Sequence, residues 1–232
     1  MNMPQIVPIR LGFTKAFLVK DEGAVLIDTG CPGDENRIMA ALRKEGVAPG
    51  DLKLILQTHG HYDHCGSTRM LKDIISAPVA IHRDDVHLIT KGTCDPLIPI
   101  RLGARLVRLI SYQPFAPVVP DVIIDHEMDL RAYGVRGRIL FTPGHTVGSI
   151  SVLLDGGEAI AGDLMFGGYL DGSLLSRHPG YHYFADDLAA LRQSIKKLMD
   201  QGVNTVHVAH GGPLARQAVL ERFKISDLRF QI

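Results

Sequence analysis

Residues 58–66 read THGHYDHCG and place three histidines and one aspartate within six consecutive positions, 59–64. The apolar run at 52–57 comes directly before them and predicts a short buried strand, because it is brief and rich in branched side chains. The cluster therefore lies on the loop at the C-terminal end of that strand, where functional residues are commonly placed. Imidazole nitrogens and carboxylate oxygens are ligands that zinc-like metals prefer, so the stretch predicts a metal site.

Four ligands on so short a loop cannot all point at a single ion. Alternation along the chain directs His59 and His61 to one side, and a turn directs Asp63 and His64 to another. The stretch therefore predicts two ligand sets. The structural alternative is a solvated loop that happens to be rich in histidine.

The pattern His-x-His-x-Asp-His after an apolar strand resembles the signature of the metallo-β-lactamase-fold hydrolase superfamily, which draws its other ligands from three later loops. Matching segments follow in the expected order, with PGHT at 143–146, AGD at 161–163 and AHGG at 209–212. Upstream, LIDTG at 26–30 matches the early strand and turn of the family. Several matched segments in order are more specific than any one of them, and they extend over most of the chain.

The resemblance implies a binuclear metal centre. It assigns His59, His61 and His145 to one metal, Asp63, His64 and His210 to the other, and Asp163 to a bridge between them. The expected cofactors are two divalent ions, with zinc in first place and iron or manganese as alternatives. A hydroxide between the ions is the expected nucleophile, and Asp63 and Asp163 are the expected catalytic carboxylates.

The predicted activity is the hydrolysis of a small ester, thioester or lactone. One alternative is an iron-dependent oxidoreductase that resembles the persulfide dioxygenases, since these also carry the histidine-rich pattern. A β-lactamase is another alternative, although the carboxylate at Asp163 counts against the cysteine-containing lactamase subclass. Lactone hydrolases of the superfamily have a tyrosine three residues after the bridging aspartate, where this chain has Phe166.

Composition limits the partners. The 25 acidic and 25 basic residues balance, so no global field attracts nucleic acid or a membrane surface, and a small-molecule substrate is expected. No apolar run is long enough to span a bilayer, and the first residues lack a signal-peptide pattern, which predicts a cytoplasmic protein. The three cysteines include no CxxC pair, so a disulfide framework is not expected. Composition does not indicate an oligomeric state.

The order of elements predicts an α/β protein with one domain over residues 1–232. Strands are expected at 6–11, 16–20, 24–28, 52–57, 78–81, 123–124, 128–132, 138–141, 150–154, 158–161 and 205–209. Helices are expected at 34–45, from about 65 to 75, from 82 onward, within 100–110, at 186–199 and at 214–223. Strands followed by helices in each half fit the αββα four-layer sandwich that the resemblance implies.

Some residues near the motif are expected to support the site without binding metal. We expect Asp28 to anchor the turn beside the metal loop, and Cys65 to fill space at a helix start. The insertion at 92–120 and the loop at 167–184, which contains His178 and His182, are expected to form walls of the pocket. Whether they act as lids is left open.

Overall fold

The computed structural model describes residues 3–225 except 95, 102, 112 and 170–171. The first half contains β1 (Gln5–Leu11), β2 (Thr14–Lys20), β3 (Ala24–Ile27), α1 (Glu35–Lys44), β4 (Leu52–Leu56), α2 (Tyr62–Cys65), α3 (Thr68–Ile74), β5 (Val79–His82), α4 (Val86–Lys91), α5 (Ala104–Ser111) and β6 (Val122–Ile124). The second half contains β7 (Met128–Asp129), β8 (Gly137–Phe141), β9 (Ile150–Leu154), β10 (Glu158–Ile160), β11 (Phe166–Tyr169), β12 (Leu174–Gly180), α6 (Leu188–Asp200), β13 (Thr205–His207), β14 (Leu214–Ala215) and α7 (Arg216–Phe223). Short 3-10 helices cover Pro49–Asp51, Arg83–Asp85 and Leu130–Tyr133. Among the described helices, none is long and apolar enough to cross a membrane.

Each half of the chain builds one sheet. The first sheet has the order β1-β2-β3-β4-β5-β6, with antiparallel pairing up to β3 and parallel pairing from β3 onward. The second has the order β14-β13-β10-β9-β8-β7, in which β10 and β13 pair in parallel. A parallel pair needs a long crossover connection, and α6 lies on the connection from β10 to β13.

Alternating side chains show how the sheets pack. Along β3, Val25 and Ile27 belong to a buried cluster that also contains residues of β8, β9 and β10, so this face meets the second sheet. Leu26 points the other way and packs in a cluster with residues of α1 and α3. Strand side chains point to opposite faces in turn, so a strand covered on both sides is apolar throughout.

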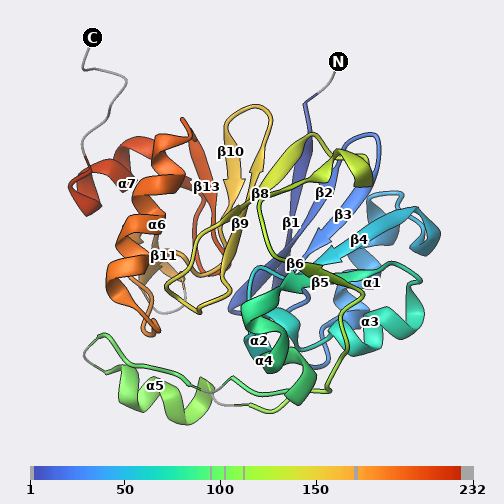
Figure 1. Cartoon of the computed structure of the whole chain (residues 1–232), viewed down its shortest axis with the longest axis horizontal. Coiled ribbons are helices and arrows are strands. Elements are labelled where there is room, and N and C mark those ends of the chain that lie inside the picture. Colours follow the sequence, from blue (N-terminus) through green and yellow to red (C-terminus); the bar gives the residue numbers. More distant parts are fainter. Residues whose placement is uncertain (1–2, 95, 102, 112, 170–171, 226–232) are drawn as a thin grey trace.

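Helices cover the outer face of each sheet. The cluster on the outer side of the second sheet contains Leu191 and Ile195 of α6 and Val219 of α7. In Figure 1, α6 and α7 flank the second sheet on the left, and α1 and α3 flank the first sheet on the right. The predicted αββα four-layer sandwich is therefore confirmed.

Three element predictions were wrong. The helix expected at 214–223 begins at Arg216, because Leu214 and Ala215 pair with β13 as strand β14. The strand expected at 128–132 ends at Asp129, because the side chain of Asp129 accepts a 2.8 Å hydrogen bond from the backbone N–H of Arg131 and starts a 3-10 turn. The segment at 167–184, expected as a loop, contributes to the antiparallel pair of β11 and β12. Its glycines and its lack of alternating apolar residues hid this pairing from sequence analysis.

Leu54 tests the contact between the sheets, because its side chain is fully buried in the cluster that both sheets share. Leu54→Ala should lower the free energy of unfolding by about 2–5 kcal/mol, since it removes apolar contacts and leaves a cavity. Lys53→Ala, at the exposed neighbouring position on β4, should change it by no more than about 0.5 kcal/mol. Denaturant titration measures both variants. If Leu54→Ala and Lys53→Ala unfolded at the same denaturant concentration, the assignment of Leu54 to the core would be contradicted.

Candidate metal centre

The structure brings all seven predicted ligands together at the ends of strands from both sheets. His59 and His61 follow β4, Asp63 and His64 lie in α2, and His145, Asp163 and His210 follow β8, β10 and β13. All are buried except Asp63, which is partly buried. His61 is the residue that precedes α2, so this short helix makes the predicted change of direction within the motif.

The ligand atoms form two groups, each with its atoms within 4.8 Å of one another. One group is His59, His61 and His145, and the other is Asp63, His64, Asp163 and His210. Nδ1 of His61 lies 3.0 Å from Nε2 of His145, and Nε2 of His210 lies 3.3 Å from Oδ2 of Asp63. Ligands about 2.0–2.1 Å from a tetrahedral ion are separated by about 3.3 Å, so the spacing suits a metal.

Asp163 lies between the two groups. Its Oδ2 is 3.5 Å from Nε2 of His145 in the first group. Its Oδ1 is 3.5 Å from Nε2 of His64 and from Nε2 of His210 in the second. The two oxygens of one carboxylate therefore face different groups.

Buried polar atoms at the centre are left unpaired. Within the described part of the chain, both carboxylate oxygens of Asp163 and the Nε2 atoms of His59, His64 and His210 have no hydrogen-bond partner. Leaving a buried polar atom without a partner costs about 1–3 kcal/mol, so a row of them calls for an explanation. A bound cation would satisfy all of them, and the residues therefore fit a metal centre.

Hydrogen bonds on the far side of the rings fix which nitrogen faces the centre. Nδ1 of His145 donates to the carbonyl of Phe184 at 3.0 Å, and Nδ1 of His210 donates to the carbonyl of Phe13 at 3.1 Å. Nδ1 of His64 donates a 2.8 Å hydrogen bond to Oδ2 of Asp28. A ring that binds a metal is neutral and has one proton, and these bonds place that proton on Nδ1, so Nε2 is the nitrogen available to bind an ion.

The two groups differ in protonation. Burial lowers the pKa of His59, His61 and His145, so these rings are neutral at pH 7. Burial acts in the same direction on His210, but two neighbouring carboxylates outweigh it and raise its pKa to about 10. Burial alone would raise the pKa of Asp163, but the positive charge of nearby histidines holds it well below its usual range.

Asp28 anchors the metal loop. Its Oδ1 accepts a 2.8 Å hydrogen bond from the backbone N–H of Thr58, and its Oδ2 accepts a 2.8 Å bond from the hydroxyl of the same residue. Because the Thr58 hydroxyl donates its proton to Asp28, it accepts from Nδ1 of His59 at 3.1 Å. The expectation that Asp28 anchors the turn is confirmed. Cys65 is fully buried, as expected for a small side chain that fills space at a helix start, and its thiol donates a hydrogen bond to the backbone carbonyl of His59.

Sequence analysis missed the role of Asp85, which stands in the 3-10 turn before α4 and has no exposed surface. Its carboxylate accepts hydrogen bonds from the backbone N–H groups of Gly60 and Gly148, both at 2.9 Å. It also accepts a 2.7 Å bond from the hydroxyl of Thr146. Asp85 thereby joins the loop of His59 to the loop of His145. No local pattern signals a contact between positions so far apart in the chain.

His182 reaches the centre as well. It follows β12, and its Nε2 lies 3.3 Å from Oδ2 of Asp163. Distance alone groups it with His145 and Asp163 as a third set of possible ligands. Burial lowers its pKa to about 3, so the ring is neutral. The sequence placed His182 in a pocket wall but gave no sign that it differs from His178, which is exposed.

A cleft opens above the two groups. It holds about 430 Å³ of empty space, part of it open to solvent. Besides the ligands, its walls include Phe13, Tyr62, Leu97, Val107, His182, Tyr183 and Phe184. The insertion at 92–120 joins the segment after β12 through two backbone hydrogen bonds, Ile100 N–H to Tyr183 O at 2.9 Å and Ala185 N–H to Ile98 O at 3.0 Å. Both segments therefore form walls of the cleft, as the sequence predicts.

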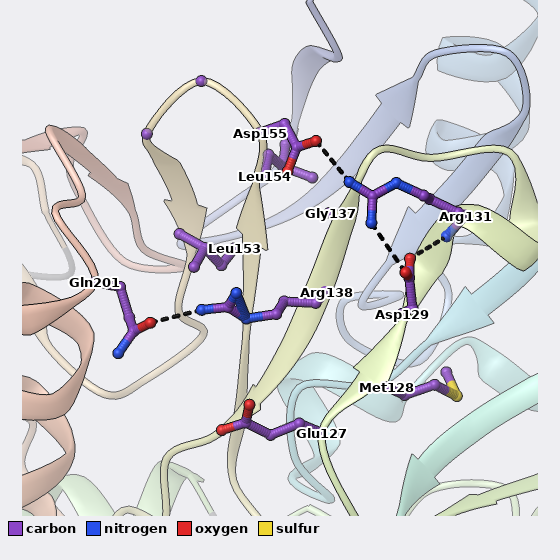
Figure 2. A pocket seen from close by; sticks show the side chains of 12 residues that line it. Glu127, Met128, Asp129, Arg131, Gly137, Arg138, Leu153, Leu154, Asp155 and Gln201 are labelled. Carbon is purple, nitrogen blue, oxygen red and sulfur yellow. Dashed lines mark hydrogen bonds and ion pairs between the residues drawn. The ribbon is translucent and has the colours of Figure 1, made fainter.

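A larger hollow, about 970 Å³ and also open to solvent, lies beside β7, β8 and β9. Figure 2 shows Arg131 between the carboxylates of Asp129 and Asp155, with 2.9 Å contacts to each, and Arg138 bonded to Gln201. The residues described in its lining include neither histidine nor cysteine. The ligand geometry, and not the size of the hollow, therefore locates the reactive centre under the smaller cleft.

Known proteins are similar to this chain in sequence. The family profile of the Metallo-beta-lactamase superfamily matches residues 9–210. A protein of Methanocaldococcus jannaschii named "probable metallo-hydrolase" is 29% identical over 153 residues, which are 66% of this chain and 68% of that protein. A protein of Bacillus subtilis with the same description is 28% identical over 206 residues, or 82% of this chain and 76% of that protein.

A solved structure shows the same fold. The crystal structure of BLEG-1 B3 metallo-beta-lactamase superposes with a TM-score of 0.70 at 23% identity, and the match covers 98% of this chain and 100% of that chain. The family profile spans most of the sequence, and histidine and aspartate side chains are positioned to form a metal site. The chain therefore belongs to the metallo-beta-lactamase superfamily, as a metallo-hydrolase.

Proposed function

We propose that the protein hydrolyses a small ester, thioester or lactone and uses two divalent metal ions, with zinc as the expected metal. The observation that carries this proposal is the Asp163 carboxylate, whose oxygens lie 3.5 Å from ligand nitrogens of two different groups and have no hydrogen-bond partner among the described residues. A carboxylate so placed suits a bridge between two ions.

Chemistry supplied by bound divalent ions would be the acidification of a water molecule and the polarisation of a carbonyl oxygen. The protein's own part is to hold the ligands in position. Hydrogen bonds from Nδ1 orient His64, His145 and His210 before any ion binds. The carboxylates of Asp63 and Asp163 supply negative charge that offsets the charge of the ions.

The walls of the cleft favour a small acyl compound. Phe13, Leu97 and Val107 give the cleft an apolar lining, which suits an uncharged group beside the reacting carbonyl. Phe166 is buried and stacks on the ring of His210, with centroids 5.2 Å apart, so it supports a ligand where lactone hydrolases of the superfamily have a tyrosine. Among the described residues that line the cleft, no side chain distinguishes an ester from a thioester or a lactone.

Metal analysis and a substrate screen test the proposal together. Protein purified without added metal should hold about two divalent ions per chain. It should hydrolyse at least one of a set of p-nitrophenyl esters, thioesters and lactones, and a cephalosporin and a phosphodiester serve as comparisons. One iron per chain together with oxygen uptake on a persulfide would replace the proposal with the oxidoreductase alternative. Turnover of the cephalosporin alone would replace it with the β-lactamase.

Asp163→Ala should remove at least one ion per chain and lower kcat by about 10²-fold or more, because it removes the carboxylate shared by the groups. His178→Ala is the matched control, since His178 is an exposed residue of β12. It should keep both ions and its activity. Metal content and steady-state kinetics are measured on each variant. Full metal content in Asp163→Ala would refute the bridge.

Loss of metal at low pH should be stepwise. The pKa of His210 is raised to about 10, so at neutral pH this ring must release a proton before it binds an ion. Burial lowers the pKa of His59 and His61, whose rings have no such proton to release. As the pH falls, the ion at the second group should therefore leave first.

Metal content after equilibration between about pH 8 and pH 5 measures this order. Asp63→Ala is the reference, because it should lack the ion of the second group. Its remaining ion should persist at the pH where the wild-type protein has lost one of two. Simultaneous loss of both ions from the wild type, or early loss from Asp63→Ala, would contradict the expected order.

A further inference from the structure

Three histidines and Asp163 surround the space where the two groups meet, and one of them, His182, is not among the predicted ligands. Its ring centroid lies 4.7 Å from that of His145 and 5.7 Å from that of His210. Its Nε2 lies 3.3 Å from Oδ2 of Asp163, which is within the 3.0–3.5 Å range of the distances between predicted ligands. Distance therefore does not distinguish His182 from a metal ligand.

The hydrogen bond at the other ring nitrogen does distinguish it. Nδ1 of His182 accepts a 3.2 Å hydrogen bond from the backbone N–H of Phe184. A ring nitrogen that accepts a hydrogen bond carries a lone pair, so the single proton of the neutral ring is on Nε2. His145 has the opposite arrangement, because its Nδ1 donates to the carbonyl of the same Phe184 at 3.0 Å. His145 thus turns a lone pair toward the centre, whereas His182 turns an N–H toward it.

The N–H of His182 remains available to a bound molecule. Its side chain is 11% exposed and lines the cleft, whereas the side chain of Asp163 is 1% exposed. Among the described residues, no hydrogen bond engages Nε2, since Oδ2 of Asp163 is close but has no hydrogen-bond partner. A fixed donor next to a metal centre and open to the cleft is suited to an oxygen on which negative charge develops.

We propose that His182 is not a metal ligand but a hydrogen-bond donor, whose Nε2–H binds the substrate oxygen that gains negative charge during hydrolysis. This inference rests on the proposed function. The ring keeps its proton throughout, so its contribution is electrostatic. The backbone of Phe184 positions it by holding Nδ1 as an acceptor.

The test compares His182→Ala and His182→Gln with His178→Ala, all as metal-loaded full-length protein. His182→Ala should keep the metal content of the wild type and lower kcat about 10²- to 10³-fold with little change in KM, because one donor to the charged oxygen is lost. His182→Gln should recover part of the rate, since its amide N–H can lie near the position of Nε2–H. His178→Ala should match the wild type in every measurement.

A second measurement does not depend on turnover. The ¹⁵N–¹H spectrum of the metal-loaded protein, with the resonance of His182 assigned through the variant, should show a protonated Nε2 and an unprotonated Nδ1. Loss of an ion in His182→Ala, or an Nε2 without a proton, would overturn the assignment as a donor. Unchanged kcat in His182→Ala would overturn the contact with substrate. If the wild type hydrolyses no substrate, the proposed function fails, while metal content and the spectrum still decide whether His182 is a ligand.

Discussion

Three hydrogen bonds converge on the buried carboxylate of Asp28, and the geometry of the metal loop depends on them. They fix Thr58 at the start of the motif and His64 near its end, and through Thr58 they orient His59. Asp28 has a positive φ of 61°, which is uncommon for a residue other than glycine. The strained backbone turns this side chain from the end of β3 under the neighbouring loop, and the three donors compensate for the burial of its charge.

Most strands and helices, and the first four ligands of the metal centre, could be predicted from local sequence, whereas His145, Asp163 and His210 were assigned by the resemblance to the family. The apolar run before His59 predicts a strand. The alternating direction of side chains along the chain, followed by a turn, separates His59 and His61 from Asp63 and His64. The contributions of Asp85 and His182 could not be read in this way. Asp85 acts on loops far from it in sequence, and the difference between His182 and a metal ligand lies in the backbone atom that faces Nδ1. Neither the contacts of Asp85 nor the hydrogen bond at Nδ1 of His182 affects the periodicity or the composition of the sequence.

The centre also connects the two halves of the sandwich. His59, His61, Asp63 and His64 come from the first sheet's side, whereas His145, Asp163 and His210 follow strands of the second. Each ligand group contains members from both sides. The apolar layer between the sheets brings these strand ends together, and Asp85 joins two of the loops directly. The alignment of the sheets therefore determines whether either group can assemble.

Phe184 assigns opposite roles to two histidines through its main chain, with its carbonyl facing His145 and its N–H facing His182. Every residue type except proline offers the same two groups, so exchange of the phenyl ring for another side chain leaves the assignment in place. Insertion or deletion of one residue in this segment would change the assignment, because it would place other peptide groups opposite the rings of His145 and His182. Evolution can thus vary the surface of the cleft at this position by point mutation, while changes in loop length are the changes that would alter its chemistry.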